Sequence, residues 1–198
     1  MATTHALAGL LLGAGVAATV PEFATVAMLA GFAGGIFPDL DLYVAHRKTL
    51  HFPVYFPVAA GLAVPVAAVV PSSATVAAAV FLAAAALHST SDLFGGGLEL
   101  RPWEGRSDRA VYSHYHGRWF APRRWVPYDG APADLALAAL LGLPALAVGN
   151  GVVDPLVTGA LAVSVGYTLV RKRLPDLADA LADLVPRRVA TYVPERYL

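Results

Sequence analysis

Cysteine is absent from this 198-residue chain, and charged residues are scarce. Without cysteine the chain can form no disulfide and offers no thiolate to a metal, so a metal site would need His, Asp, Glu, backbone or water ligands. Charged residues make up 14% of the chain, against about 25% in soluble domains. The formal net charge is zero, so no basic excess favours nucleic acid as a partner. With 57% hydrophobic residues, this composition predicts an integral membrane protein.

Apolar residues form six stretches that are joined in pairs by short breaks at residues 21–22, 71–73 and 149–151. Short breaks join antiparallel neighbours, so we predict an all-α bundle of about six transmembrane helices arranged as three hairpins. No Lys or Arg precedes Arg47, so the first stretch lacks the basic region of a signal peptide and is expected to be a membrane helix. The stretches cover roughly residues 6–20, 23–37, 53–70, 74–87, 133–149 and 152–170.

Positive charges occur only between the predicted hairpins and after the last one. With six spans, all 14 Lys and Arg residues fall on one side, and the opposite loops carry only Glu22 and Asp154. Lys and Arg are retained on the cytoplasmic side of a membrane. We therefore predict a multi-pass protein of the cell (inner or plasma) membrane with both termini in the cytoplasm. The 14 residues are Arg47, Lys48, Arg101, Arg106, Arg109, Arg118, Arg123, Arg124, Arg171, Lys172, Arg173, Arg187, Arg188 and Arg196.

The C-terminal segment has a different pattern. Leucines recur at helical spacing between residues 174 and 185, with aspartates at other positions, which predicts an amphipathic helix lying at the membrane interface. The alternative is a helix that packs on the cytoplasmic loops. We accordingly divide the chain into a membrane-embedded domain, residues 1–173, and a cytoplasmic tail, residues 174–198. The leucines are Leu174, Leu177, Leu181 and Leu184.

Small residues inside the predicted spans indicate where helices approach one another. Glycine lets membrane helices pack closely, although in alanine-rich helices it can also reflect looser packing. The glycines concerned are Gly9, Gly13, Gly31, Gly34 and Gly35.

Several ionisable residues far apart in sequence fall at the same, predicted cytoplasmic edge of the membrane. His88 and Asp92 are four residues apart, so on a helix they share a face and suit two ligands of one metal, or a ligand and its partner. Asp39 and Asp41 follow Pro38 and can point the same way from a turn, although they could also cap a helix. His and Asp ligands without Cys suit Zn, Mn, Fe or a similar divalent ion. The edge residues are His5, Asp39, Asp41, His46, His51, His88 and Asp92.

These residues occur in motifs whose order resembles one known family. The motifs are Thr4-His5-x-x-x-Gly9, Pro38-Asp39-Leu40-Asp41, His46-Arg47-x-x-x-His51, and His88-x-x-x-Asp92 followed by Gly95-Gly96-Gly97 and Pro102. Over about residues 1–130 the chain resembles the LexA-regulated inner-membrane family of metal-dependent hydrolases, whose members are described as similar to zinc-dependent phospholipase C. Leu50 and Phe52 stand where that family usually has threonine and serine.

The resemblance implies a membrane-bound, metal-dependent hydrolase for which zinc is the favoured ion. The substrate class it suggests is a phospholipid-like phosphodiester at the cytoplasmic membrane edge. Asp41 would be a general base or would support a ligand, and Arg47 would stabilise developing negative charge. The alternative is a non-enzymatic metal-binding membrane protein, either a transporter or an assembly factor. A transporter is expected to carry ionisable groups near mid-span, where this chain has almost none. The expected metal ligands are His5, Asp39, His51, His88 and Asp92.

The central loop carries an aromatic and basic segment, residues 112–119, that includes His114 and His116. Such a segment is typical of a membrane interface. The functional interpretation is a lid that binds an anionic headgroup through Arg118 and His116.

Overall fold

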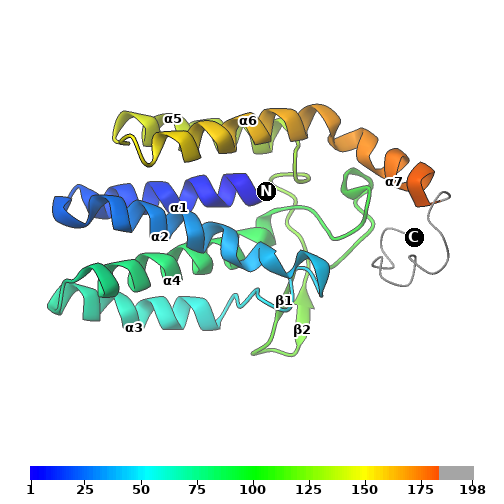
Figure 1. The fold of residues 1–198 in the computed structure, drawn as a ribbon. Coiled ribbons are helices and arrows are strands. Elements are labelled where there is room, and N and C mark those ends of the chain that lie inside the picture. The colour runs from blue at the N-terminus through cyan, green and yellow to red at the C-terminus, as the bar shows by residue number, and fades with distance from the viewer. Residues whose placement is uncertain (183–198) are drawn as a thin grey trace.

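The computed structural model describes residues 1–182 and is built mainly from six apolar helices. Each helix coincides with one of the six predicted apolar stretches, and Figure 1 shows them as three antiparallel hairpins lying side by side. The predominantly α-helical fold is therefore confirmed. The helices are α1 Ala2–Ala17, α2 Ala24–Ile36, α3 Tyr55–Val69, α4 Ser73–Ser91, α5 Pro132–Ala147 and α6 Asp154–Val170.

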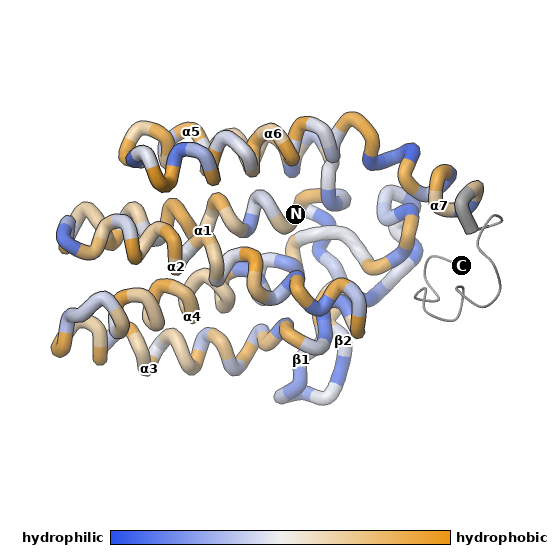
Figure 2. The backbone as a smooth tube through the Cα atoms, viewed as in Figure 1, coloured by the Kyte–Doolittle hydropathy of each residue, from blue (hydrophilic) through white to orange (hydrophobic). Residues whose placement is uncertain are grey.

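The two ends of the bundle differ in polarity. All three short breaks lie at one end, and the long polar connections lie at the other, together with the N-terminus (Figure 1). The backbone coloured by hydropathy shows hydrophilic residues gathered at this second end (Figure 2), which we call the polar end. Its elements are the 3-10 helices η2 Phe37–Tyr43, η3 Asp92–Phe94, η4 Pro102–Glu104 and η5 Arg171–Arg173, the strands β1 Val111–Ser113 and β2 Arg118–Phe120, and helix α7 Leu174–Ala182; η1 Pro21–Phe23 lies at the opposite end.

A small antiparallel sheet accompanies the helices at the polar end. Strands β1 and β2 pair with Val111 opposite Phe120 and Ser113 opposite Arg118, so the central loop is a hairpin rather than an irregular segment. Each strand has three residues, too few for an alternating pattern to stand out in the sequence.

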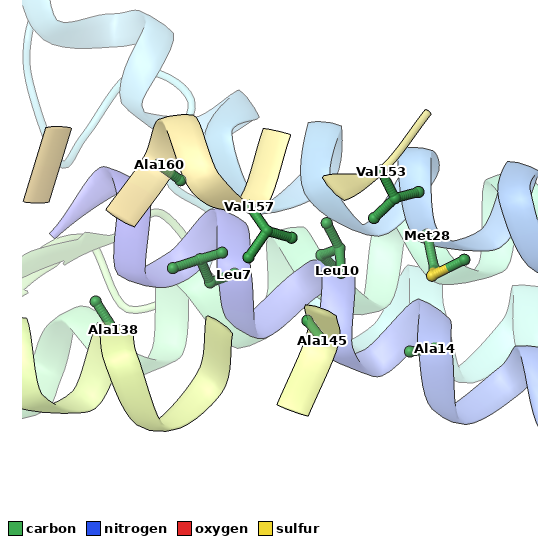
Figure 3. Close-up of a cluster of buried hydrophobic side chains, with 9 residues drawn as sticks. All are labelled: Leu7, Leu10, Ala14, Met28, Ala138, Ala145, Val153, Val157 and Ala160. Atoms are coloured by element: carbon green, nitrogen blue, oxygen red, sulfur yellow. The ribbon is translucent and has the colours of Figure 1, made fainter. Parts of the chain in front are cut away.

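Helix α1 lies at the centre of the bundle and contacts α2, α4, α5 and α6. Leu7 and Leu10 on α1 are fully buried together with Val153, just before α6, and Val157 of α6, and Met28 of α2 completes this part of the core (Figure 3). Burying these apolar side chains against one another holds the α5–α6 hairpin to the first hairpin.

Glycines allow α1 and α2 to lie almost backbone to backbone. A Cβ atom at Gly9 would overlap the carbonyl of Gly31, and one at Gly13 would overlap the carbonyl of Ala27. Gly34 contacts the backbone of Phe81 on α4 in the same way. The prediction that these glycines mark close helix contacts is confirmed.

Two helical segments are long and apolar enough to cross a membrane, Pro21–Tyr43 and Ser73–Phe94. Helices α1, α3 and α5 are apolar but shorter. Pro21–Tyr43 is continuous because η1, α2 and η2 follow one another without a break, so its polar end carries Asp39 and Asp41 directly into the interior of the protein.

Helix α7 begins at Leu174, where the leucine pattern begins, and it packs on the polar end. Arg101 forms ion pairs with Asp176 at 3.0 Å and Asp179 at 2.8 Å. This is the second of the two predicted arrangements, a helix packed on the loops. The predicted continuation through Leu184 falls outside the described residues, as do the last three arginines of the tail.

Candidate metal centre

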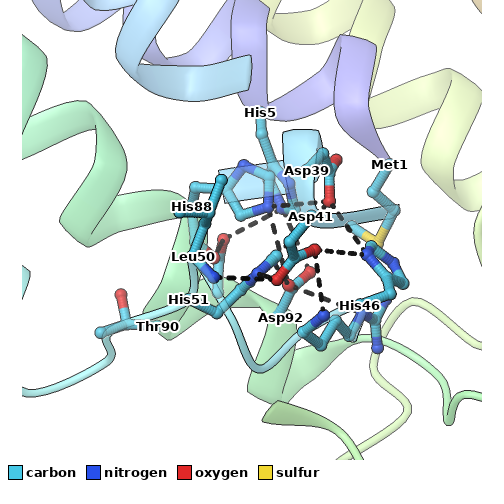
Figure 4. A network of polar contacts seen from close by, with 12 residues as sticks. Met1, His5, Asp39, Asp41, His46, Leu50, His51, His88, Thr90 and Asp92 are labelled. Atoms are coloured by element: carbon cyan, nitrogen blue, oxygen red, sulfur yellow. Dashed lines mark hydrogen bonds and ion pairs between the residues drawn. The ribbon is translucent and has the colours of Figure 1, made fainter. Parts of the chain in front are cut away.

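Several elements bring the edge residues together at the polar end. His5 comes from the first turns of α1, Asp39 and Asp41 from η2, and His51 from the turn before α3. His88 comes from the last turn of α4, and Asp92 begins η3 directly after it. Figure 4 shows their side chains converging on one point. The rings of His5 and His88 have centroids 4.0 Å apart, and those of His51 and His88 are 5.0 Å apart. The fold thus brings these side chains together in one place.

Four ligand atoms form a closed ring at the centre of this group, which we call the ligand ring. Nε2 of His51 lies 3.1 Å from Oδ2 of Asp92 and 3.6 Å from Oδ1 of Asp39. Nε2 of His88 lies 3.4 Å from the same Asp39 oxygen and 3.6 Å from the same Asp92 oxygen. Ligands held about 2.0–2.2 Å from a tetrahedral zinc ion are about 3.3–3.6 Å from one another. The spacing of the ring therefore fits one divalent ion.

The ring atoms are also short of hydrogen-bond partners. Nε2 of His51, Nε2 of His88 and Oδ2 of Asp92 are buried and have no hydrogen-bond partner. Buried polar atoms without partners are costly, and three that face one another require an explanation. A bound cation would satisfy all three at once, so these buried residues could hold a metal ion.

Hydrogen bonds at the far sides of the two rings fix which nitrogen faces the centre. Nδ1 of His88 lies 2.6 Å from the carbonyl oxygen of Gly35, so this nitrogen carries the hydrogen. Nδ1 of His51 lies 3.0 Å from Oδ2 of Asp41 and donates to that carboxylate. In the neutral ring each Nε2 then keeps its lone pair, which is the arrangement that metal-binding histidines adopt.

The carboxylate of Asp41 forms hydrogen bonds that stabilise the loop around His51. Its carboxylate accepts hydrogen bonds from the backbone N–H groups of Leu50 at 3.0 Å and Arg47 at 3.3 Å, and it lies 3.1 Å from Nδ1 of His46. Of the two predicted roles, the geometry favours support of a ligand over proton abstraction. It also explains how Leu50 can replace a hydroxyl residue, because the backbone of Leu50 makes this contact.

His51 has a strongly perturbed pKa. Burial lowers the pKa of the ring, but the hydrogen bond to Asp41 and the negative charges of Asp41 and Asp92 outweigh burial and raise the pKa to about 9. A metal ion must displace this proton, so binding at neutral pH would release it.

His5 differs from the other two central histidines. Its Nε2 lies 3.1 Å from Oγ of Ser91, whose hydroxyl donates to the carbonyl of His88 at 3.0 Å, so Nε2 of His5 is the donor to Ser91. The same nitrogen lies 3.9 Å from Oδ1 of Asp92. His5, His88 and Asp92 form a second group with metal-ligand spacing. Because both groups need the single free nitrogen of His88, they describe one ion site, with His5 at its edge.

His46 belongs to the site although it was not among the expected ligands. Its Nδ1 lies 3.8 Å from Oδ1 of Asp39, in addition to its contact with Asp41. The spacing His46-Arg47-x-x-x-His51 was the signal that could have included it, since the intervening turn brings both rings to the two aspartates (centroids 5.6 Å apart).

Arg47 links the site to the central loop. It is buried, adopts a left-handed backbone conformation with φ of 58°, and donates through Nη1 to the carbonyl of Gly96 at 2.7 Å. Its Nε lies 3.5 Å from Oδ2 of Asp92, so the guanidinium places a fixed positive charge beside the ligand ring. The backbone carbonyl of Arg47 accepts from the N–H of Tyr112, which anchors the β-hairpin beside the site.

A cavity of about 480 Å³ opens from the ligand ring. Asp39, Arg47 and Asp92 line one end of it, and Tyr167 and Arg171 line the other. Arg118 and His116 are not among the lining residues: Nδ1 of His116 lies 2.8 Å from Oγ of Ser113, and the guanidinium of Arg118 lies over the ring of Phe120. The interpretation of these two residues as a headgroup-binding lid therefore stays a prediction, and the arginines that line the cavity are Arg47 and Arg171.

The far end of the cavity contains a second polar cluster that the sequence analysis missed. Arg171 contacts both carboxylate oxygens of Asp129, at 3.1 and 3.2 Å, and the hydroxyl of Tyr167 also donates to Asp129. Burial raises the pKa of Asp129, but the amino terminus, Arg171 and the Tyr167 hydrogen bond together bring it below its usual value. The cluster ties the start of α5 to the end of α6.

No family model, curated protein or solved structure matches the chain. The resemblance to metal-dependent hydrolases consequently depends on the motif residues alone.

Proposed function

We propose that the protein is a multi-pass membrane hydrolase that uses one divalent metal ion, zinc, to cleave a phospholipid-like phosphodiester at the cytoplasmic membrane edge. The observation that carries the proposal is the ligand ring, in which three buried, unpartnered ligand atoms and Asp39 converge beside a cavity. A bound ion would act as a Lewis acid, polarising a phosphoryl or carbonyl oxygen and acidifying water.

Exposed apolar side chains support a multi-pass arrangement. On α3, Val58, Leu62 and Val66 are four residues apart and each is more than half exposed, so they form one apolar stripe. Leu140 on α5 and Leu169 on α6 are exposed in the same way. Monomeric soluble proteins rarely expose so much contiguous apolar surface, whereas lipid solvates it without cost. With all six helices crossing, both termini lie on the side that holds the basic residues.

The residues in and around the ligand ring have different roles in the proposed reaction. His51 and His88 hold the ion through nitrogens whose direction is set by Asp41 and Gly35. Arg47 lines the cavity beside Asp92, where its charge favours a substrate oxyanion. Asp39, whose side chain is 20% exposed, is the ring member most open to the cavity, so it is the ligand that a substrate oxygen could replace.

The alternative is a metal-binding protein without turnover, and one observation favours it. Four protein ligands close a tetrahedral shell, which is typical of structural zinc sites, whereas catalytic sites keep a position open. Under this alternative Asp39 stays bound and the ion contributes only to stability.

One experiment separates the two. The purified protein in mild detergent is analysed for bound metal, then reconstituted in lipid vesicles and assayed for release of a soluble phosphorylated headgroup, with zinc, manganese or magnesium and with a chelator. The hydrolase proposal requires release that the chelator abolishes. Stoichiometric metal without release under any ion would leave the non-enzymatic alternative, and absence of bound metal would refute both.

A further inference from the structure

The cavity continues from the ligand ring along α6 to the outside of the bundle. Leu135 of α5 and Val163 and Ser164 of α6 line it, although they lie far from the ring in sequence. Val163 is also 59% exposed on the surface of the protein, whereas Ser164 is buried. A residue that is both lining and exposed marks an opening, so the cavity has a mouth at Val163.

The mouth lies at the depth of lipid chains. Val163 precedes Val170, the last residue of α6, by seven residues, which corresponds to about 10 Å along a helix axis. The basic residues Arg171–Arg173 follow directly and would lie at the level of the lipid headgroups. In the six-span arrangement, the mouth at Val163 therefore faces hydrocarbon rather than water.

The opposite side of the cavity is covered by α7. Leu174 and Ala178 line the cavity, and the acidic face of the same helix is fixed to Arg101 through Asp176 and Asp179. The covered side is the side of the basic loops, where water would enter. Helix α7 thus covers part of the water-facing side, where Leu42 of η2 lines the cavity and is 37% exposed. The mouth at Val163 is the opening that faces the membrane.

From these observations we infer that the mouth at Val163 is a lateral portal through which the acyl chain of a membrane phospholipid enters, so that its phosphodiester reaches the ligand ring. The chain lies along Leu135 and Val163, and the headgroup lies between the ring and Arg171. The inference deepens the proposed function: the substrate is a lipid taken directly from the bilayer. Binding of the chain, however, does not require that the lipid is cleaved.

The test uses the full-length protein in nanodiscs that contain a phospholipid carrying a photoreactive diazirine on one acyl chain. After irradiation and digestion, mass spectrometry locates the attached lipid. We expect labelling of Leu135, which lines the cavity, and of Ser164, which is buried, so that a chain reaches Ser164 only from within the cavity. Val163→Trp fills the mouth and should reduce this labelling by about tenfold, equivalent to ~1.4 kcal/mol. Val165→Trp is the matched control, because Val165 is an exposed valine on the same helix that does not line the cavity.

The outcomes distinguish this inference from the proposed function. Labelling inside the cavity that Val163→Trp removes and Val165→Trp retains supports the portal, whether or not the lipid is hydrolysed. Absence of label at Leu135 and Ser164, or equal labelling in both variants, overturns it. Chelator-sensitive hydrolysis of the water-soluble bis(4-nitrophenyl) phosphate by the unsubstituted protein would preserve the hydrolase in either case.

Discussion

The carbonyl oxygen of Gly35 accepts a hydrogen bond from Nδ1 of His88 across 2.6 Å, and the same glycine lies against the backbone of His5. A single residue without a side chain therefore sets both the close approach of α1 to α2 and the direction of a metal-binding nitrogen. Helix packing and the proposed chemistry are linked at this position.

Gly35→Ala should damage packing and the metal site together. The new Cβ would overlap the backbone of His5, and relief of such overpacking typically costs about 1–3 kcal/mol. We expect a lower midpoint of thermal unfolding in detergent and less bound metal. Gly15→Ala, on the same helix as His5 and with no atom near the added Cβ, should change neither property. Equal behaviour of the two variants would contradict the packing argument.

His88→Ala should abolish metal binding while the protein still inserts in the membrane. His88 supplies one of the two nitrogens of the ligand ring and belongs to both groups with metal-ligand spacing. Metal analysis and the headgroup-release assay measure the two losses. His114→Ala is the control, since His114 contacts the backbone of Lys48 outside the ring. Retention of stoichiometric metal by His88→Ala would show that the site is assigned to the wrong residues.

Asp41→Asn should weaken metal binding without removing a ligand. The amide keeps the shape of Asp41 but lacks the charge that orients and polarises His51. Loss of such a partner typically reduces metal affinity by about 10–100-fold. Competition with a chelating dye measures the dissociation constant. Glu22→Gln removes a charge at the opposite end of the bundle and should leave the dissociation constant unchanged. If Asp41→Asn also left the dissociation constant unchanged, Asp41 would not orient His51 for metal binding.

Metal affinity should rise with pH up to about 9, the pKa of His51 before metal binds. Below that value a proton must leave the ring for each ion bound, so affinity should change by about tenfold per pH unit. The stability of the metal-free protein should change with pH in the opposite direction to metal affinity. Since the folded-state pKa lies above the ordinary value of 6.5, the protonated ring stabilises the metal-free protein fully below about pH 6.5, and this contribution is lost as the pH rises through about 9. A metal titration and a metal-free unfolding series over the same pH range check both directions.

Cysteine labelling should place the two ends of the bundle on opposite sides of the membrane. The native chain has no cysteine, so single substitutions report cleanly. Asp108→Cys, in the exposed central loop, should react with an impermeant reagent only from the cytoplasmic side, and Gly151→Cys, in the α5–α6 turn, only from the other. Reaction of both from the same side would refute the six-span arrangement.

The sequence by itself determined the six helices and their pairing. Long apolar stretches separated by breaks of two or three residues can fold in few ways other than as helical hairpins. The helical repeat alone placed His88 and Asp92 on one face, where Nε2 of His88 lies 3.6 Å from Oδ2 of Asp92. It also indicated that His5, Asp39 and His51 would lie at the same edge, because hairpin topology brings every second connection to the same end.

Only the tertiary structure decided what each of these residues does. Whether a histidine presents Nε2 or Nδ1 depends on contacts between distant segments, such as His88 with Gly35, 53 positions apart. The same holds for Asp41, which the fold brings within hydrogen-bond distance of His51. It also holds for His5, which forms a hydrogen bond with Ser91, 86 residues away in the sequence. The partnership of Asp129 with Arg171 and the mouth at Val163 likewise arise where α5, α6 and α7 meet. Local sequence fixes helical periodicity through short-range sterics and burial, but hydrogen-bond partners across the bundle are set by how the helices pack, and no local pattern records that packing.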